Sequence, residues 1–267
     1  MNRELLSEYK NKDEKMLLAQ ILDKAENANK KNKIEYTDFL DMAQVELVQK
    51  FIKKQEIKNY ISYGGYEDAE RKIFVFYPEK FNEQVVEKNL VNIVQIIRIK
   101  LPDDLNGKYT HRDYLGGVMK LGVKREKIGD ILSNKDGASI IVLKESVEYV
   151  ISGLKELTRF GKSEFKELRL EDLKIEEPKT ITTDVIIPSM RIDSLVSEMI
   201  RTSRAKAAEI IKEERVFVNH ELVVKSSKEV KENDIVTIRG KGRFRVGAIL
   251  NSTRKGNLVV QIEKYIS

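Results

Sequence analysis

The residues from Met190 to Asn219 constrain the fold most, because two helical patterns and a strand pattern follow one another directly. Ser203 suits the N-cap of the second helix, which runs to about Lys212, since its hydroxyl can accept from free backbone N–H groups. Residues 216–219 are rich in β-branched and aromatic side chains and end on a turn former. We therefore predict two short helices at an angle, followed by a β-hairpin. The apolar stripe of the first helix consists of Ile192, Leu195, Val196, Met199 and Ile200.

Polar side chains remain on one side of this helix pair, and most of them are cations. A helix N-terminus with Arg and Lys nearby suits a phosphate group, because free N–H groups, the helix dipole and the side-chain charges act together. A solvated basic helix face has the same composition, so this pattern alone leaves both interpretations open. The candidate residues are Arg201, Ser203, Arg204, Lys206 and Lys212, with Arg191 supporting the helix pair.

The positive charge of the whole chain is concentrated at this end. The formal net charge is +6, and residues 185–267 hold 16 Lys and Arg against 10 Asp and Glu. The 184 residues before them carry 33 charges of each sign, so they are neutral as a group. An excess of positive charge favours a polyanionic partner through counterion release.

A second cationic segment follows a predicted strand at residues 235–238 and reads Arg-Gly-Lys-Gly-Arg-Phe-Arg. Glycine lets a backbone approach a phosphate closely, and we expect the Phe244 ring to stack on a base. A bent strand edge with solvated cations is the alternative interpretation. The candidate RNA contacts here are Arg239, Lys241, Arg243, Phe244 and Arg245, together with Asn219 at the hairpin turn.

These residues resemble the S4 domain, the RNA-binding domain first named in small-subunit ribosomal protein S4. Glu214, His220 and Asn233 stand where glycine is common in that domain. Asn adopts the left-handed backbone conformation readily, so the substitution at position 233 is mild, while the other two bear on turn geometry. The resemblance implies an RNA-binding module. It lies in Arg191-Ile192-Asp193, Ser203-Arg204, Ala208, Ile211-Lys212, Val216-Phe217-Val218-Asn219 and Asn233-Asp234-Ile235-Val236.

The segment before residue 58 has the periodicity of helices. We expect Thr37 or Asp38 to be the N-cap of the second of two helices. The two apolar stripes are Leu17, Leu18, Ile21, Leu22 and Ala25 in the first helix, and Phe39, Leu40, Ala43, Leu47 and Phe51 in the second.

The residues from 58 to 175 change to a mixture of strand and helix patterns. We predict a hairpin of strands 61–63 and 73–77, further strands at 91–101, 139–143 and 165–170, and helices beginning near Thr110 and Glu145. This order fits an α+β sandwich similar to ferredoxin-like or RRM-like folds. The predicted class is α+β, with an N-terminal helical region (1–57), an RRM/ferredoxin-like α+β middle domain (58–175), and a joint followed by an S4-type αα-hairpin with a small β-sheet (176–267).

The predicted helix near Thr110 has two unusual features. Thr110 and Asp113 are spaced as a capping box. Gly116 and Gly117 follow, and each costs about 1 kcal/mol relative to Ala in a helix interior. Such a cost indicates either close packing against another backbone or a backbone kept free for a partner. A second RNA-contacting surface is expected from His111, Arg112, Lys124, Arg125 and Lys127.

The same region carries a further resemblance. Residues 111–119 (HRDYLGGVM) and 121–132 (LGVKREKIGDIL) are similar to a stretch typical of bacterial YlmH proteins, as is the RGKGRF run at 239–244. YlmH proteins have an N-terminal helical part, an RRM-like middle and a C-terminal S4 domain. The resemblance implies RNA binding at the ribosome, with rRNA, tRNA and the large subunit as partners. Related short S4 proteins bind obstructed large subunits carrying peptidyl-tRNA, so we expect a role in ribosome quality control.

No enzyme class is supported by the motifs, and we expect no catalytic residue. Residues 111–113 point about 100° apart on a helix, so they cannot converge as a catalytic triad. Asp113 lies one position early for the catalytic Asp of one class of pseudouridine synthases, and no Thr-Ser-Gly follows it. A methyltransferase would need a glycine-rich loop, and Gly240 and Gly242 lack its third glycine at the right spacing. An RNA-modifying enzyme centred on Asp113 and a protein-interaction scaffold linked to cell division remain the alternatives.

Composition narrows the remaining classes. The chain has no cysteine and two histidines, which excludes disulfides and thiolate metal sites and argues against a His-rich metal centre. We therefore expect no cofactor, metal or small-molecule substrate. The first residues lack the apolar core of a signal peptide, and no apolar run approaches the roughly 18 residues of a membrane span. These features predict a cytoplasmic protein without a membrane partner, and we separately expect a monomer.

Overall fold

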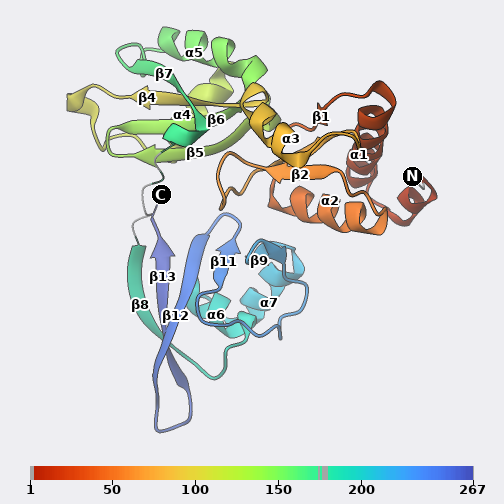
Figure 1. Ribbon diagram of the computed structural model, residues 1–267. Helices are drawn as coiled ribbons and strands as arrows, with labels where there is room; N and C mark the ends of the chain where they lie inside the picture. The colour runs from red at the N-terminus through yellow and green to blue at the C-terminus, as the bar shows by residue number, and fades with distance from the viewer. Residues whose placement is uncertain (1–2, 174, 176–179, 267) are drawn as a thin grey trace. The chain divides into compact units, whose positions relative to one another are not determined.

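The computed structural model describes residues 3–173, 175 and 180–266, and it divides into two compact units, residues 1–176 and 177–267 (Figure 1). Each unit contains both helices and strands, so the predicted α+β class is confirmed. Within these described ranges, no helix is both long enough and apolar enough to cross a membrane. Residue 174, at the end of the predicted middle domain, and residues 176–179, in the predicted joint, lie outside the described residues.

The N-terminal residues form a 3-10 turn η1 (Arg3–Glu8) and the helices α1 (Lys12–Lys31) and α2 (Met42–Lys54). Asp41 caps α2, because its carboxylate accepts from the backbone of Ala43 and Gln44, and the Gln44 side chain accepts from Asp41 N in return. The caps predicted at Thr37 and Asp38 are wrong. Thr37 accepts a hydrogen bond from Phe74 N instead, and Asp38 pairs with Lys127.

A three-stranded antiparallel sheet packs against these helices, in the order β1-β3-β2. The predicted hairpin is confirmed as β2 (Tyr60–Tyr63) and β3 (Ile73–Phe76). The third member, β1 (Glu35–Tyr36), pairs with β3 and has only two residues, too few to show a period. The sheet thus joins segments from both sides of residue 57, and a domain boundary at that residue stays a prediction.

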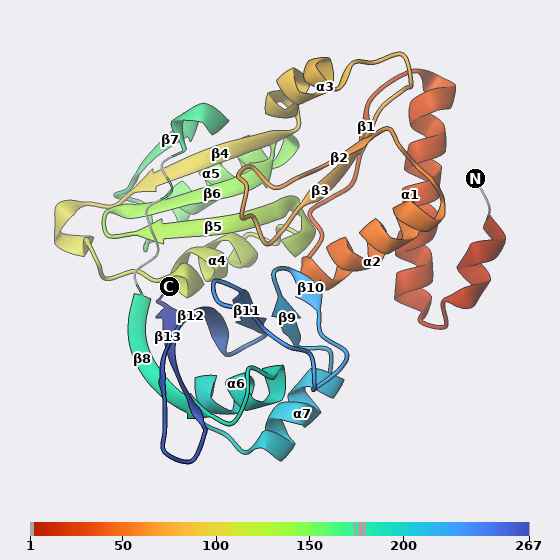
Figure 2. The same cartoon turned by 60° about the horizontal axis from the view of Figure 1, so that its bottom comes forward.

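The following residues form a four-stranded antiparallel sheet in the order β5-β6-β4-β7, seen side by side in Figure 2. The chain order is strand, helix, strand, strand, helix, strand, which is the ferredoxin-like arrangement. Its elements are β4 (Val94–Lys100), α4 (His111–Lys120), β5 (Ile128–Asn134), β6 (Gly137–Leu143), α5 (Val147–Glu156) and β7 (Glu164–Leu168). A helix α3 (Glu83–Asn89) precedes them, and 3-10 turns lie at η2 (Leu90–Asn92), η3 (Asp103–Leu105), η4 (Arg125–Lys127), η5 (Lys144–Ser146) and η6 (Leu170–Asp172).

Both faces of this four-stranded sheet are covered. Ile97 and Ile99 of β4 pack in one core cluster with residues of α4 and α5. Ile96 of β4 and Ile141 of β6 pack in another cluster with residues of β3 and α3, and both side chains are fully buried. RRM domains stack bases on the face opposite their helices. In this protein the N-terminal sheet occupies that face, so RNA can reach the four-stranded sheet only at its helices, loops and edges.

The C-terminal unit is a six-stranded antiparallel sheet, in the order β10-β9-β11-β12-β13-β8, packed against two helices. The predicted helix pair is confirmed as α6 (Ile192–Met199) and α7 (Arg204–Lys212). Their apolar side chains share one cluster with alternate residues of the strands, among them Val236, Phe244 and Ile262. The strands are β8 (Thr180–Ile187), β9 (Val216–Val218), β10 (Glu221–Leu222), β11 (Ile235–Ile238), β12 (Gly242–Ser252) and β13 (Leu258–Tyr265).

Candidate nucleic-acid interface

The turn between α6 and α7 is built by its own polar groups. Ser203 is the N-cap of α7, as predicted, because its Oγ accepts from Lys206 N at 3.2 Å. Thr202 N donates to Ser197 O at 2.8 Å, and Arg201 takes a left-handed φ of 51° that ends α6. Residues 203–206 are exposed, so the first turn of α7 is accessible to a ligand.

Asp193 organises two of the predicted cations around a buried carboxylate. Its Oδ2 accepts from Arg191 Nη2 at 2.9 Å and from Arg204 Nη2 at 3.0 Å, and its Oδ1 accepts from Arg191 Nε at 3.2 Å. The hydrogen bond from Arg191, followed by that from Arg204, lowers the pKa of Asp193 from 3.8 to about 2. The carboxylate is therefore ionised at neutral pH and holds both guanidinium groups in place.

This arrangement leaves both arginines available to an anion. The side chains of Arg191 and Arg204 are 40% and 49% exposed, whereas that of Asp193 is 9% exposed. A guanidinium has five N–H donors, so each arginine keeps donors for a phosphate after binding Asp193. One carboxylate neutralises only one of the two cations, and the cluster carries a net positive charge. Pre-positioned guanidinium groups lose less freedom on binding phosphate than flexible ones.

The remaining cations of the helix pair are less constrained. Arg201, Lys206 and Lys212 are all exposed. Lys206 Nζ pairs with Glu209 at 2.8 Å, one helical turn along α7. An exposed pair of this kind contributes little to stability and exchanges readily for a phosphate contact.

The side chain of Asn219 forms hydrogen bonds within the protein at the hairpin turn. Its amide donates to Asp234 Oδ1 at 2.8 Å, and its Oδ1 accepts from Ile235 N at 2.9 Å. Asn219 and His220 have φ of 51° and 69°, and Asn233 has φ of 70°, so the turn keeps a left-handed geometry without glycine. The Asn219 side chain therefore holds the hairpin against β11.

The outer face of the C-terminal sheet carries the second predicted group of cations. Side chains alternate along β12, so Phe244 points into the core while Arg243 and Arg245 lie on the opposite face. The guanidinium carbons of Arg243 and Arg245 lie 5.3 Å and 5.9 Å from the centre of the Tyr265 ring. Arg239 similarly lies 5.3 Å from the Phe217 ring. Cation–π contacts therefore orient all three arginines.

Two consequences follow for the residues predicted at 239–245. Phe244 is 2% exposed, so the prediction that its ring stacks on a base is wrong; alternation along the strand directs it inward. Lys241 is exposed in the turn before β12. The sheet separates Arg239, Arg243 and Arg245 from the helix pair, because α6 and α7 pack on the other face. The structure therefore divides the predicted contacts between two surfaces of the C-terminal unit.

The second predicted surface, in the N-terminal unit, is also divided. Arg125 Nη1 donates to Ile128 O and Gly129 O, at 2.5 Å and 3.1 Å, and Lys127 pairs with Asp38 and Glu145, both at 2.8 Å. Burial lowers the pKa of Arg125 to about 10. Both cations thus bind the protein itself, whereas Arg112 and Lys124 are exposed.

His111 is partly buried, and Asp113 is engaged by other residues of the protein. Burial, followed by the charge of Arg125, lowers the pKa of His111. Asp113 completes the predicted capping box with Thr110 and pairs with Arg159 at 2.6 Å. Hydrogen bonds from the Thr110 backbone and side chain lower the pKa of Asp113. A carboxylate so engaged is ionised and poorly suited to accept or deliver a proton near neutral pH.

Three family models match the chain. The model described as "YlmH, N-terminal" matches residues 13–80, the "Putative RNA-binding domain in YlmH" matches residues 91–176, and the S4 domain matches residues 190–236. The chain belongs to the YlmH family.

The chain is also similar to two individual proteins. The "Ribosome-associated protein quality control protein P2" of Bacillus subtilis (strain 168) is 29% identical over 255 residues, which cover 95% of this chain and 96% of the relative. A solved structure titled "Cell division protein ylmH from Streptococcus pneumoniae" is similar at a TM-score of 0.48 and 20% identity. That similarity covers 62% of this chain and 98% of the solved one.

Tyr265 and Asp193 each contact two of the candidate arginines of this YlmH protein, and neither is among the residues predicted from the sequence. Tyr265 lies one strand away from Arg243 and Arg245, on β13, and the tail gives no motif for it. Asp193 belongs to the Arg-Ile-Asp opening of the S4 pattern, so the sequence alone indicates that it lies near Arg191. Its contact with Arg204 depends on the angle between the helices.

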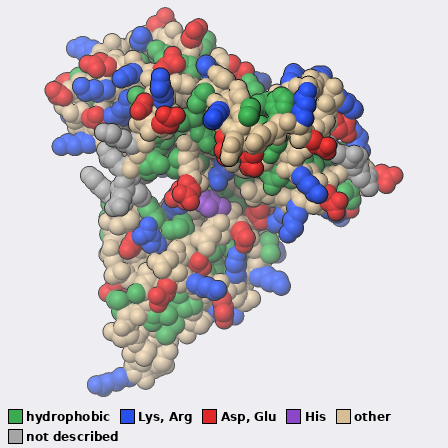
Figure 3. All heavy atoms as spheres, viewed as in Figure 1, with side chains coloured by type: hydrophobic (Ala, Val, Ile, Leu, Met, Phe, Trp, Pro, Cys, Tyr) green, Lys and Arg blue, Asp and Glu red, His purple; other side chains and the backbone are tan. Residues whose placement is uncertain are grey.

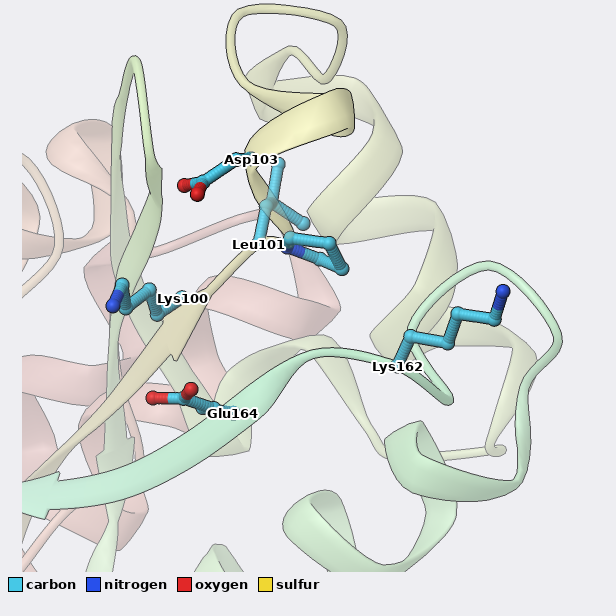
Figure 4. Close-up of a pocket in the computed structure, with 6 residues that line it drawn as sticks. Lys100, Leu101, Asp103, Lys162 and Glu164 are labelled. Carbon is cyan, nitrogen blue, oxygen red and sulfur yellow. The ribbon is translucent and has the colours of Figure 1, made fainter.

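The N-terminal unit of this YlmH protein has shallow pockets and mixed surface charge. One pocket, of about 130 Å³, is lined by Lys100, Leu101, Pro102, Asp103, Lys162 and Glu164 (Figure 4). Lysine and acidic side chains alternate around it, without a convergent set that would define a catalytic site. On the face shown in Figure 3, Lys and Arg are likewise interspersed with Asp and Glu over this unit.

Proposed function

We propose that this YlmH-family protein is a non-enzymatic, cytoplasmic RNA-binding protein that acts as a monomer at the ribosome. It binds rRNA or tRNA on the large subunit, in the rescue or quality control of stalled peptidyl-tRNA complexes. The observation that carries this proposal is the Arg191–Asp193–Arg204 cluster beside the Ser203 cap, inside a matched S4 domain. The name of the B. subtilis relative supports the ribosomal setting.

The mechanism is capture of the RNA backbone at two surfaces of the C-terminal unit. Arg204, Lys206 and the exposed first turn of α7 bind phosphate, and Arg191 is held beside them by Asp193. Arg239, Arg243 and Arg245 bind a separate stretch of backbone on the sheet face. Contacts of this kind position a protein on RNA without reading its sequence, which suits a ligand recognised by shape.

A non-enzymatic role is supported by the state of the only catalytic candidate from the sequence. Asp113 caps α4, pairs with Arg159 and has a lowered pKa. Neighbouring His111 is partly buried and also has a lowered pKa. An ionised carboxylate engaged in this way is poorly suited to exchange protons with an RNA base, which supports the proposal.

Sedimentation with large ribosomal subunits, and titration of tRNA, across a salt series test the proposal. Arg204→Gln combined with Lys206→Gln should weaken binding and reduce the slope of log affinity against log salt by about one per lost phosphate contact. The matched control is Lys15→Gln with Lys53→Gln, which removes the same charge from exposed positions of α1 and α2. Unchanged affinity and slope in the α7 variant, or equal losses in both variants, would refute the assignment.

A further inference from the structure

Two neighbouring glycines in α4 have opposite surroundings. A Cβ on Gly117 would lie 2.5 Å from Phe160 Cε2 and 3.3 Å from Leu154 Cδ2, so packing requires glycine there. A Cβ on Gly116 would meet no atom within 4 Å, and the residue is exposed. Neither glycine has a positive φ. Glycine is less favourable than alanine inside a helix, so the described structure gives no internal reason for Gly116.

Cations flank the exposed glycine. Arg112 and Lys120 lie four residues before and after Gly116, on the same face of α4 and about 6 Å away along its axis. Lys124 follows in the exposed turn after the helix. Asp113, the only acid of α4, forms an ion pair with Arg159. Lys127 forms ion pairs with Asp38 and Glu145. Across the described chain, no ion pair involves Arg112, Lys120 or Lys124.

The chemistry of this face fits a nucleic-acid backbone. Arg112, Lys120 and Lys124 are exposed, and the one acid of α4 is neutralised by Arg159. None of the large apolar side chains that are exposed in the described residues belongs to α4. A surface of cations without exposed apolar groups complements a polyanion and offers little to a protein partner.

We propose that the exposed face of α4, formed by Arg112, Gly116 and Lys120 with Lys124 beyond it, binds the sugar–phosphate backbone of RNA. The absence of a side chain at Gly116 brings the backbone against the helix, and the cations on either side bind its phosphates. The covered sheet face makes this helix face the accessible alternative within the RRM-like fold. This assignment rests on the proposed RNA-binding function and adds a contact surface in the N-terminal unit.

Gly116→Ala separates stability from binding. The full-length variant should melt about 2–4 °C higher, because alanine favours the helix and meets no clash. It should also bind large subunits at least about fivefold more weakly, because the added methyl group displaces the RNA backbone. A variant that merely damaged the fold would have both a lower melting temperature and a lower affinity. Gly117→Ala is the matched control and should melt at a lower temperature, since Phe160 blocks the added methyl.

A second variant tests the cations directly. Arg112→Gln with Lys120→Gln should lower the salt slope by about two for both large subunits and rRNA extracted from them. If this variant and Gly116→Ala bind like the parent while the α7 variant does not, the α4 surface is refuted and the proposed function stands. If the parent binds neither RNA, both proposals fail. Loss with intact subunits but not with extracted rRNA would indicate a ribosomal protein as the partner and would overturn this inference.

Discussion

The C-terminal unit and α4 both present cations to solvent, but they hold them in different ways. Arg191 and Arg204 are fixed by Asp193, and Arg243 and Arg245 lie over Tyr265. Arg112 and Lys120 of α4 have an empty helix position between them instead of an organising partner. The first arrangement fixes the direction of each donor before RNA arrives. The second supplies charge and room, and in the proposed complex its geometry would be set by the RNA.

The largest expected effect is loss of the organising carboxylate. Asp193→Asn removes a counter-charge at a position that is 7% exposed, while the two guanidinium side chains that it leaves are 40% and 49% exposed. The loss of this charge should destabilise the C-terminal unit by about 2 kcal/mol. Urea unfolding, followed by hydrogen exchange in residues 192–212, measures this loss. Asp113→Asn, which removes the partly exposed cap of α4, should cost its unit about 1 kcal/mol. If the two variants lost the same unfolding free energy, Asp193 would stabilise its unit no more than an ordinary helix-capping residue does.

Acid should weaken the same cluster. A depressed pKa means that the native state binds the proton less readily than the unfolded state, so the stabilisation is complete above about pH 4 and is lost as pH falls towards 2. The shift from 3.8 to about 2 corresponds to about 2 kcal/mol. The difference in unfolding free energy between parent and Asp193→Asn should therefore shrink across this interval. A constant difference from pH 6 to pH 2 would contradict the assignment of the low pKa to Asp193.

The smallest expected effect concerns the sheet face. Tyr265→Leu keeps the charge and much of the apolar contact but removes the ring beneath Arg243 and Arg245. It should cost less than about 1 kcal/mol in stability and weaken RNA binding about threefold, with an unchanged salt slope. Arg243→Lys with Arg245→Lys should have a similar effect, since lysine stacks less well on an aromatic ring. Parent-like affinity in both variants would mean that charge alone suffices there, as on α4.

The helix pair, its Ser203 cap and the Thr110 capping box were predictable because each depends on residues close in sequence. The alternation of side chains could likewise have placed Phe244 in the core. Phe244 and Val246 are two positions apart on β12, and both pack in the core with Val236 of the neighbouring strand β11. The glycines at 240 and 242 instead favoured a close approach to phosphate, which led to the expectation that Phe244 stacks on a base.

Other features depend on contacts between distant segments. The strand β5 was not predicted, since its alternation is interrupted by a register shift after Ile128 and by Asp130. Asp130 accepts hydrogen bonds from Tyr66 and from the backbone of Glu70 and Arg71, which fixes a loop some sixty positions away. Lys127 resembles a surface cation in the sequence until the fold brings Asp38 beside it. Local periodicity carries no information about such partners.

The pairing of β8 with β13 has a consequence for synthesis. Thr180 pairs with Tyr265 and Ile187 with Leu258, so the first strand of the C-terminal unit pairs with residues that are synthesised about seventy or more positions later. In the described residues, the strands of the N-terminal unit form sheets only with one another, so we expect this unit to fold while translation continues. A nascent chain that stops before residue 258 would leave β8, which reads TITTDVII, as an unpaired edge rich in β-branched residues. Such edges recruit other strands and aggregate, so an incomplete copy of this protein would itself need removal.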